Sequence, residues 1–150
     1  MRLVIQRVSQ ASVLIDQNAH AAIKNGLIVL IGVENNDSTS DADYLAAKCI
    51  GLRVFDDENG KMNLSVGDIS GEILIVSQFT LHAATKKGNR PSFIKAAKPE
   101  KAIPLYEYFI QKMNSSLKSK IKTGVFGANM QLELINDGPV TILIDSKNKE

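Results

Sequence analysis

The chain of 150 residues is poor in the residues that build disulfides, metal sites and acid–base active sites. It has one cysteine, Cys49, two histidines, His20 and His82, and no tryptophan. A single cysteine excludes an internal disulfide and is typical of a protein from a reducing compartment. The cysteine and histidines do not have the spacing of a zinc-binding motif. The sequence therefore predicts a cytoplasmic protein with no metal site and no cofactor.

Long hydrophobic runs are also missing. No stretch approaches the ~18 consecutive apolar residues of a membrane span, and residues 1–7 turn polar too soon for a secretory signal peptide. The apolar fraction of 44% and the charged fraction of 23% are ordinary for a globular protein. Because this length corresponds to about one domain, we expect residues 1–150 to form a single domain, with a frayed polar tail over residues 146–150.

The net charge of +2 is small, but the cations are unevenly distributed. Residues 86–101 contain one acidic residue, Glu100, and six basic residues: Lys86, Lys87, Arg90, Lys95, Lys98 and Lys101. Such a stretch can neutralise nucleic-acid phosphates. It is equally what a solvated, lysine-rich loop looks like, and composition alone favours that second interpretation.

Hydrophobic patterning predicts a chain of mixed α and β structure. We expect strands over residues 3–8, 11–15, 20–23, 27–33, 72–79, 130–135 and 140–144. We expect helices around residues 40–52, where Ser40 and Asp43 form a plausible capping pair, and over 100–117, with Pro104 in the first turn. Because most strands follow one another without a helix between them, we predict a three-layer β/β/α sandwich, mostly antiparallel, with both main helices on one side.

Two motifs of small and polar residues stand at strand ends, far apart in the sequence. The first is Ser77-Gln78-Phe79-Thr80-Leu81, and the second is Asn136-Asp137-Gly138-Pro139-Val140-Thr141. Glycine accepts backbone angles that other residues avoid, and only a bond preceding proline is readily cis. A Gly-Pro tip can therefore present main-chain carbonyls in a fixed geometry.

The first motif offers hydroxyl groups but no evident base. Ser77 and Thr80 lie outside a G-x-S-x-G elbow, and His82 has no sequence neighbour whose carboxylate could orient it. Hydroxyls at a strand end ordinarily bind the local backbone. The backbone N–H groups of Phe79 and Thr80 offer another chemistry, because two such donors can stabilise an oxyanion without a titratable group.

Phe126 and Met130 precede the second motif. An aromatic ring and a thioether suit the flat face of a nucleobase, and they suit a hydrophobic core equally well. The sequence alone favours the core.

Taken together, these motifs resemble those of the D-aminoacyl-tRNA deacylases of the common bacterial and eukaryotic type, which carry a Gly-cisPro motif. The resemblance covers nearly the whole chain and includes residues 60–64, 90–93 and 126–130 besides the two motifs. It implies a homodimer of β/β/α subunits. It also implies hydrolysis of the ester that joins a D-amino acid to the 3′-terminal adenosine of tRNA, which yields free tRNA and D-amino acid. Mischarged glycyl-tRNA is a further implied substrate.

The resemblance also implies roles for single residues. Gly138 and Pro139 would reach into the partner subunit's site, bind the substrate's α-amino group and exclude L side chains, and Arg7 would hold that tip. The backbone of Phe79 and Thr80 would line the ester, with catalysis assisted by the 2′-hydroxyl of the tRNA. Ser77 and Gln78 would shape the pocket, and Phe126 and Met130 would flank the adenine. The tRNA phosphates would be contacted by Lys86, Lys87 and Arg90.

Two other classes of function stay open on the residues alone. A nucleic-acid-binding module without catalysis would explain both the basic stretch and the missing base. A serine- or threonine-dependent esterase would need a base near Thr80, and only His82 is available for that role.

Overall fold

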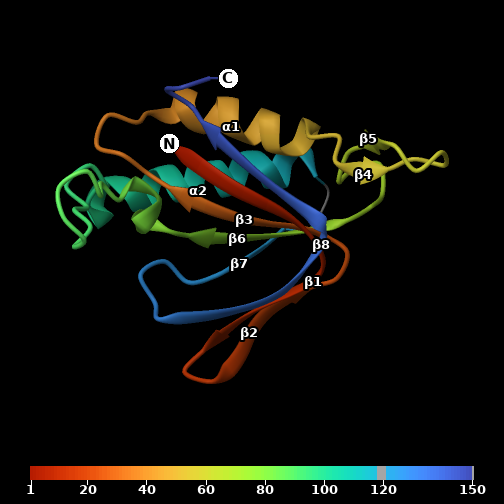
Figure 1. The fold of residues 1–150 in the computed structure, drawn as a ribbon, viewed down its shortest axis with the longest axis horizontal. Coiled ribbons are helices and arrows are strands. Elements are labelled where there is room, and N and C mark those ends of the chain that lie inside the picture. The colour runs from red at the N-terminus through yellow and green to blue at the C-terminus, as the bar shows by residue number, and fades with distance from the viewer. Residues whose placement is uncertain (118–120, 150) are drawn as a thin grey trace.

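Two long strands, β1 (Arg2–Ile15) and β8 (Met130–Asp145), run side by side and tie the two ends of the chain together (Figure 1). The computed structural model describes residues 1–117 and 121–149. Within that part of the chain the other elements are β2 (Asn18–Ile23), β3 (Gly26–Gly32), α1 (Thr39–Gly51), β4 (Phe55–Asp56), β5 (Met62–Leu64), β6 (Glu72–Ser77), the 3-10 helix η1 (Phe79–His82), α2 (Pro99–Ser116) and β7 (Ile121–Thr123). Each segment that the sequence predicts as helix or strand overlaps one of these elements.

The hydrophobic pattern predicts two strands where the structure has one long strand, both for β1 and for β8. The structure corrects both predictions. The first half of β1, residues 2–8, pairs antiparallel with β3, and the second half, residues 11–15, pairs antiparallel with β2. β8 pairs antiparallel along the other edge of both halves. Ser9 and Gln10 are exposed, but they lie where the strand bends and changes partner rather than in a loop.

The bend folds the sheet into two layers with two hydrophobic cores. Beyond β3 the sheet continues through two parallel neighbours, β6 and then β7. On β3, Leu27, Val29 and Ile31 belong to the core beneath the helices, whereas Ile28 and Leu30 belong to a second core shared with β2 and the lower half of β1. A strand buried on both faces reads as a continuous apolar run. The predicted mixed α/β fold with β/β/α layers and mostly antiparallel pairing is therefore confirmed.

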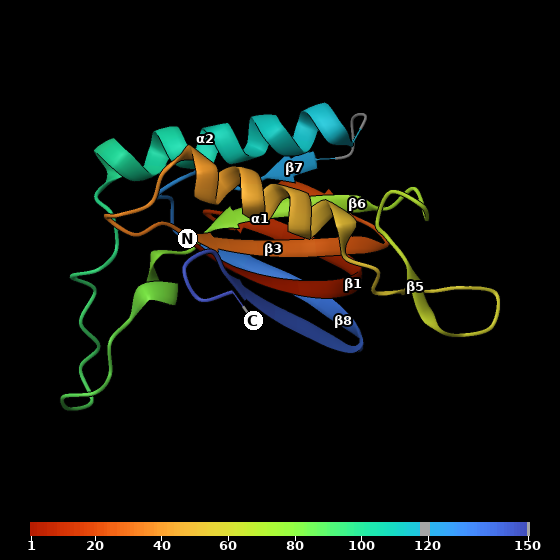
Figure 2. The same cartoon turned by 90° about the horizontal axis from the view of Figure 1, so that it is seen from above.

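Both helices cover the same face of the sheet, as predicted (Figure 2). Their starts differ from the prediction. The N-cap of α1 is Ser38, whose N–H donates to Asp41 Oδ2 at 2.9 Å, so the capping pair is not Ser40 and Asp43. In α2, Pro99 takes the first-turn position, and Pro104 therefore lies inside the helix.

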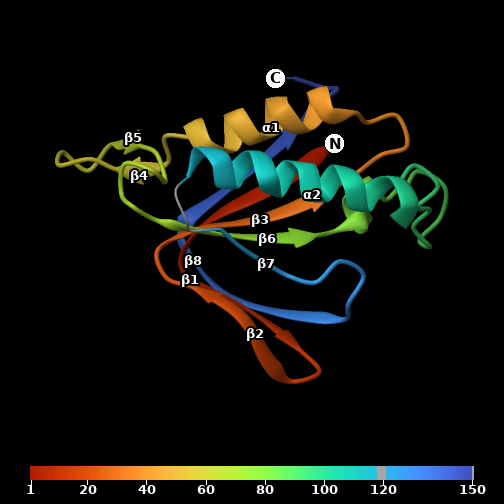
Figure 3. The same ribbon diagram turned by 180° about the vertical axis from the view of Figure 1, so that it is seen from behind.

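The short strands β4, β5 and β7 are not predicted from the sequence, because two or three residues are too few to show alternation. The β4–β5 hairpin lies at the opposite end of the sheet from the loop that follows η1 (Figure 3). Among the described helices, none is long and apolar enough to cross a membrane.

The two ends of the chain meet in a buried polar cluster. The α-amino group of Met1 donates to Asp37 Oδ1 at 2.6 Å and to Ser146 Oγ at 2.9 Å. Lys147 Nζ lies 2.8 Å from Asp41 Oδ1. The tail that is predicted to fray is thus held at its first two residues, and its final residue lies outside the described part of the chain.

Candidate active site

A pocket opens at the edge where the parallel strands β3 and β6 end. The carboxyl ends of parallel strands meet at one edge of a sheet, which is a common position for ligands. The cavity has a volume of about 280 Å³ and is bounded by these strand ends, the start of α2 and the loop between β7 and β8. Of the residues that the sequence singles out, the lining includes Ser77, Gln78, Phe79, Phe126 and Met130. Residues from both halves of the chain therefore share one cavity.

Two aromatic rings and a thioether form one wall of the pocket. The rings of Tyr106 and Phe126 lie 5.7 Å apart at an interplanar angle of 60°, and the Tyr106 hydroxyl donates to the carbonyl of Ile75 at 3.3 Å. Met130 packs against Gly124, where a β-carbon would stand only 2.6 Å from the Met130 sulfur. Gly124 thus leaves the space that Met130 occupies. The wall suits a flat, largely apolar group such as a purine ring.

The opposite edge of the pocket is polar and backbone-rich. The N–H of Gln78 donates to the carbonyl of Ile31 at 2.8 Å, which ties the end of β6 to β3. The side-chain amide of Gln78 donates to Thr80 Oγ1 at 2.5 Å. The first hydrogen bond within η1 runs from the N–H of Leu81 to the Gln78 carbonyl. The N–H groups of Phe79 and Thr80 precede that bond, so η1 itself does not use them.

Among the described residues that line the cavity, Tyr106 alone has a titratable side chain. Burial raises the pKa of Tyr106 to about 12, so the phenol stays neutral at physiological pH. The remaining polar lining consists of hydroxyl, amide and backbone groups, including those of Ser77, Gln78 and Asn129. Such a pocket can position a ligand and stabilise an anion, but its described lining supplies no general base.

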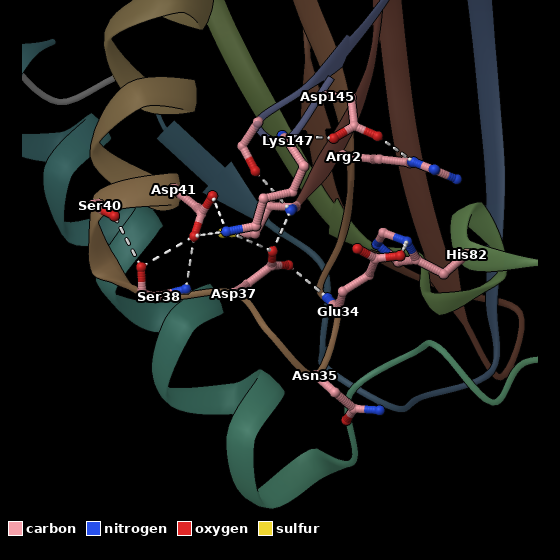
Figure 4. Close-up of polar contacts among 12 residues, drawn as sticks. Arg2, Glu34, Asn35, Asp37, Ser38, Ser40, Asp41, His82, Asp145 and Lys147 are labelled. Carbon is pink, nitrogen blue, oxygen red and sulfur yellow. Dashed lines mark hydrogen bonds and ion pairs between the residues drawn. The ribbon is translucent and has the colours of Figure 1, made fainter. Parts of the chain in front are cut away.

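His82 lies on η1 yet outside this lining. Its side chain is buried, and its Nδ1 atom lies 3.2 Å from Glu34 Oε1 (Figure 4). Neither ring nitrogen makes a hydrogen bond to a described residue. The ring also packs on Gly32, where a β-carbon would come within 3.0 Å of it. Sequence reasoning finds no carboxylate near His82 because Glu34 is distant in the chain.

The Gly138–Pro139 peptide bond is cis and lies in a bulge of β8, away from the pocket. Residues 137–140 stand opposite Arg7 of β1, between the regular pairs on either side. Gly138 has a φ of +144°, which L side chains rarely adopt. Within one chain, the described cavity lining includes neither Gly138 nor Pro139.

Arg7 connects this bulge to the loop after α1. Its Nε donates to the Asp137 carbonyl at 2.8 Å, and its Nη1 donates to the Val54 carbonyl at 2.7 Å. Its guanidinium also lies 3.6 Å from the carboxylates of Asp56 and Asp137. Because Asp56 is on β4, the bulge is anchored at the end of the sheet opposite the β7–β8 loop (Figure 1).

Asn136 closes the base of the bulge, although the sequence does not mark it as a site residue. Its Oδ1 accepts from the N–H of Val140 at 2.8 Å, and its Nδ2 donates to Gln6 Oε1 at 2.9 Å. Nδ2 also lies 3.1 Å from Thr141 Oγ1. An asparagine side chain that hydrogen-bonds nearby backbone is a common feature where a strand turns or bulges. Tyr106 is a further lining residue that the sequence does not single out, because it reads as part of the apolar face of a helix. Asn129 also lines the cavity and belongs to the segment 126–130, although the sequence predicts no role for it.

The basic residues Lys86, Lys87 and Arg90 lie on the exposed loop that follows η1. A short antiparallel bridge between Ala84 and Ser92 closes this loop. The three exposed cations therefore lie between the two ends of this bridge, in the loop at the end of the sheet where β6 ends (Figure 3).

Comparison with known proteins identifies a family over nearly the whole chain. The model of the family described as D-Tyr-tRNA(Tyr) deacylase matches residues 4–145. Proteins named D-aminoacyl-tRNA deacylase are 61% identical in Flavobacterium psychrophilum, 62% in Cytophaga hutchinsonii and 60% in Bacteroides fragilis. Each of these similarities covers 100% of this chain and 100% of the relative.

Solved structures with the same fold include two with informative titles. One, titled c-Myc DNA Unwinding Element Binding Protein, superposes with a TM-score of 0.93 at 41% identity and covers 97% of this chain and 98% of its own. Another, titled as a probable eukaryotic D-amino acid tRNA deacylase, has a TM-score of 0.80 at 18% identity, with 95% and 97% covered. The second similarity concerns the fold alone.

Proposed function

The chain belongs to the D-Tyr-tRNA(Tyr) deacylase family, whose relatives act as ester hydrolases, and on that premise we propose that it removes D-amino acids from tRNA. The substrate is the ester between a D-amino acid, or mischarged glycine, and the 3′-terminal adenosine. The products are free tRNA and the amino acid. The aminoacyl-tRNA partner and a cytoplasmic location follow from this activity.

The observation that carries the proposal is a pocket with a ring-and-thioether wall, an edge of unused backbone amides and no base. In this proposal the adenine packs against Phe126 and Met130, which line the cavity. The ester carbonyl points at the N–H of Phe79, which also lines it, and at the N–H of Thr80, which follows Phe79 just outside the described lining. Ser77 and Gln78 shape the space between them. Because the described lining holds no acid or base near neutral pKa, the 2′-hydroxyl of the terminal ribose assists the reaction. The protein then contributes position and oxyanion stabilisation.

Chiral selection comes from a second subunit in this proposal. Gly138 and Pro139 do not line their own chain's pocket, and the exposed apolar side chains Ile135 and Leu143 lie on either side of them along β8. A homodimer that covers these side chains brings the tip into the partner's pocket. There, carbonyl groups bind the α-amino group and leave no room for an L side chain.

The decisive test is release of labelled amino acid from matched D- and L-tyrosyl-tRNA. We expect fast release from the D form and an intact L form. Equal hydrolysis of both would contradict chiral exclusion. Inertness toward both, with tRNA still bound, would contradict the deacylase activity itself.

Subunit mixing tests whether the tip acts in trans. Gly138→Ala leaves the pocket intact, whereas Phe126→Asp damages the pocket and leaves the tip intact. If the tip serves the partner's site, a mixture of the two inactive variants forms heterodimers with one complete site, and activity returns. If activity stays absent although heterodimers form, the tip does not act in trans.

The substitution Thr80→Ala separates positioning from nucleophilic catalysis. Its hydroxyl accepts one hydrogen bond from Gln78, and loss of a typical bond costs about 1 kcal/mol. We therefore expect single-turnover D-tyrosyl-tRNA hydrolysis to slow by less than about tenfold. A loss approaching the ~10⁶-fold of a nucleophile knockout would instead support the esterase alternative. The buried position of His82 outside the lining argues against that alternative.

A binding module without catalysis is the second candidate. A solved structure at 41% identity is titled c-Myc DNA Unwinding Element Binding Protein, and Lys86, Lys87 and Arg90 are exposed in the loop that follows η1. In the deacylase proposal these cations contact tRNA phosphates. Nucleic-acid binding without ester hydrolysis would favour the second candidate.

A further inference from the structure

Two phenylalanine rings meet at the outer edge of the pocket. The centroids of Phe79 and Phe93 lie 5.1 Å apart with the rings at 71°, an edge-to-face arrangement. Phe79 is 56% exposed and Phe93 is partly exposed. Phe79 also lines the cavity, whereas Phe93 does not. The pair is therefore an aromatic surface that begins at the pocket and continues outside it.

Hydrogen bonds on both sides of Phe93 hold its segment in place. Ser92 exchanges two backbone hydrogen bonds with Ala84, at 2.8 and 3.0 Å. The side-chain amide of Asn35 donates to the carbonyl of Ile94 at 3.2 Å, and the N–H of Asn35 donates to the carbonyl of Lys95 at 3.2 Å. The ring of Phe93 is thus presented by a pinned backbone rather than by a loosely tethered loop.

The same segment exposes Ile94 and is flanked by positive charge. The Ile94 side chain is 85% exposed, although the backbone on either side is fixed. Arg90 and Lys95 lie on the same segment and are exposed. Exposed rings interleaved with cations are the pattern of surfaces that bind single-stranded nucleic acid.

We infer that Phe93, together with the outer side of Phe79, binds the base of the nucleotide that precedes the terminal adenosine. This inference rests on the proposed function, which places that adenosine and its ester in the pocket. The terminal ribose carries the ester at its 3′ carbon and the chain-linking phosphate at its 5′ carbon. The preceding nucleotide therefore lies about one nucleotide length from the ester, at the mouth of the pocket. In the proposed function the N–H of Phe79 faces the ester, and the ring of the same residue begins the aromatic surface. Stacking needs no particular base, which suits an enzyme acting on many tRNAs.

Two small substrates test this second nucleotide site. One is the D-tyrosyl ester of adenosine, and the other is the D-tyrosyl ester of cytidylyl-adenosine, which adds only the preceding nucleotide. For the wild-type protein we expect kcat/KM to be higher for the dinucleotide, through a lower KM. For Phe93→Ala we expect that gain to fall by roughly tenfold, since aromatic stacking contributes about 1–3 kcal/mol per base. Hydrolysis of the adenosine ester should stay unchanged.

Three control variants make the test specific. Phe93→Tyr keeps a flat ring and should restore the dinucleotide gain, whereas Phe93→Leu keeps only apolar volume and should not. Met62→Ala removes an exposed apolar side chain (58%) from β5, outside the cavity lining, and should leave the hydrolysis of both substrates unaffected.

Each outcome bears on a different claim. A dinucleotide gain that survives in Phe93→Ala, or that is absent from the wild-type protein, would overturn the second nucleotide site while adenosine-ester hydrolysis upholds the deacylase. If the wild-type protein hydrolyses neither the adenosine ester nor the dinucleotide ester, the proposed function is overturned. A changed sedimentation coefficient for Phe93→Ala would show that the ring contacts a second subunit, and this too would overturn the inference.

Discussion

At the scale of single residues, Gly138 is where one added carbon atom has the clearest consequence. Its φ of +144° is strained for any L side chain, and a β-carbon there would lie 2.7 Å from Val140 Cγ2 and 2.8 Å from the Val140 nitrogen. We expect Gly138→Ala to distort the bulge, lower the free energy of unfolding by about 1–3 kcal/mol and abolish D-selective hydrolysis. Urea unfolding and D-tyrosyl-tRNA release measure the two effects.

Gly60 supplies the matched control for this prediction. It also has a positive φ, +70°, but a β-carbon there meets nothing within 4 Å. Gly60→Ala should therefore cost only the ~1 kcal/mol of a left-handed residue and retain full activity. Equal losses of activity in both variants would show that backbone strain, rather than the shape of the bulge, explains the result.

Individual side chains also show which parts of the site can be predicted from the sequence. The pocket positions of Ser77, Gln78, Phe79, Phe126 and Met130 follow from strand-end motifs and a family resemblance. The environment of His82 does not, since Glu34 is far away in sequence and only the fold brings the two side chains together. The roles assigned to all these residues stay predictions until the variants are measured.

At the scale of elements, the loop between β7 and β8 begins with Gly124, directly after β7. A β-carbon at this position would come within 2.6 Å of the Met130 sulfur, which is the flexible part of that side chain. We expect Gly124→Ala to displace Met130 within the pocket, and to raise the KM for D-aminoacyl-adenosine at least severalfold. The free energy of unfolding should change by less than about 1 kcal/mol, because a flexible side chain can move aside.

Gly51 offers a comparison within another element. It lies at the end of α1, and a β-carbon there meets nothing within 4 Å. Gly51→Ala should leave KM unchanged and stabilise α1 by up to about 1 kcal/mol. A KM increase in Gly51→Ala as large as that in Gly124→Ala would contradict the Met130 explanation.

Element boundaries are predicted well where one periodicity holds, and badly where a strand changes partner. The apolar run over residues 27–33 identifies β3, because that strand is buried on both faces. The polar Ser9 and Gln10 read as a loop, although the backbone continues through them as β1 bends. Similarly, the sequence predicts two strands, over residues 130–135 and 140–144, with a Gly-Pro tip between them, yet Gly138 and Pro139 form a bulge within one strand, β8. Local residue preferences cannot reveal these tertiary pairings.

At the scale of the whole molecule, buried carboxylates link stability to pH. Asp41 is almost fully buried; burial alone would raise its pKa, but hydrogen bonds from Lys147, Ser146 and Ser38 lower it well below its ordinary value of 3.8. A carboxylate with a depressed folded-state pKa stabilises the fold above its ordinary value, and that stabilisation is lost as pH falls below it. We expect the free energy of unfolding to decline from about pH 4 downward.

The variant Asp41→Asn tests this dependence. It should lower the free energy of unfolding at pH 7 by roughly 2 kcal/mol and flatten the decline below pH 4. Asp43 forms an exposed ion pair with Lys112 at 3.0 Å, so Asp43→Asn should change stability by less than about 1 kcal/mol. An acid decline of unchanged slope in Asp41→Asn would mean that other groups cause it. Urea titrations at pH 3 and pH 7 provide the measurement.

The pairing of β1 with β8 also has a consequence for the time at which the molecule becomes functional. Arg2 pairs with Asp145, so one edge of β1 has no partner until ribosomes have made the last described strand. At about 5–20 residues per second, that edge waits on the order of ten seconds after its own synthesis. Met130 and Leu132 of the same strand complete the pocket wall. An interrupted chain is therefore inactive at every length short of β8, and its unpaired edge can pair with other chains until translation is finished.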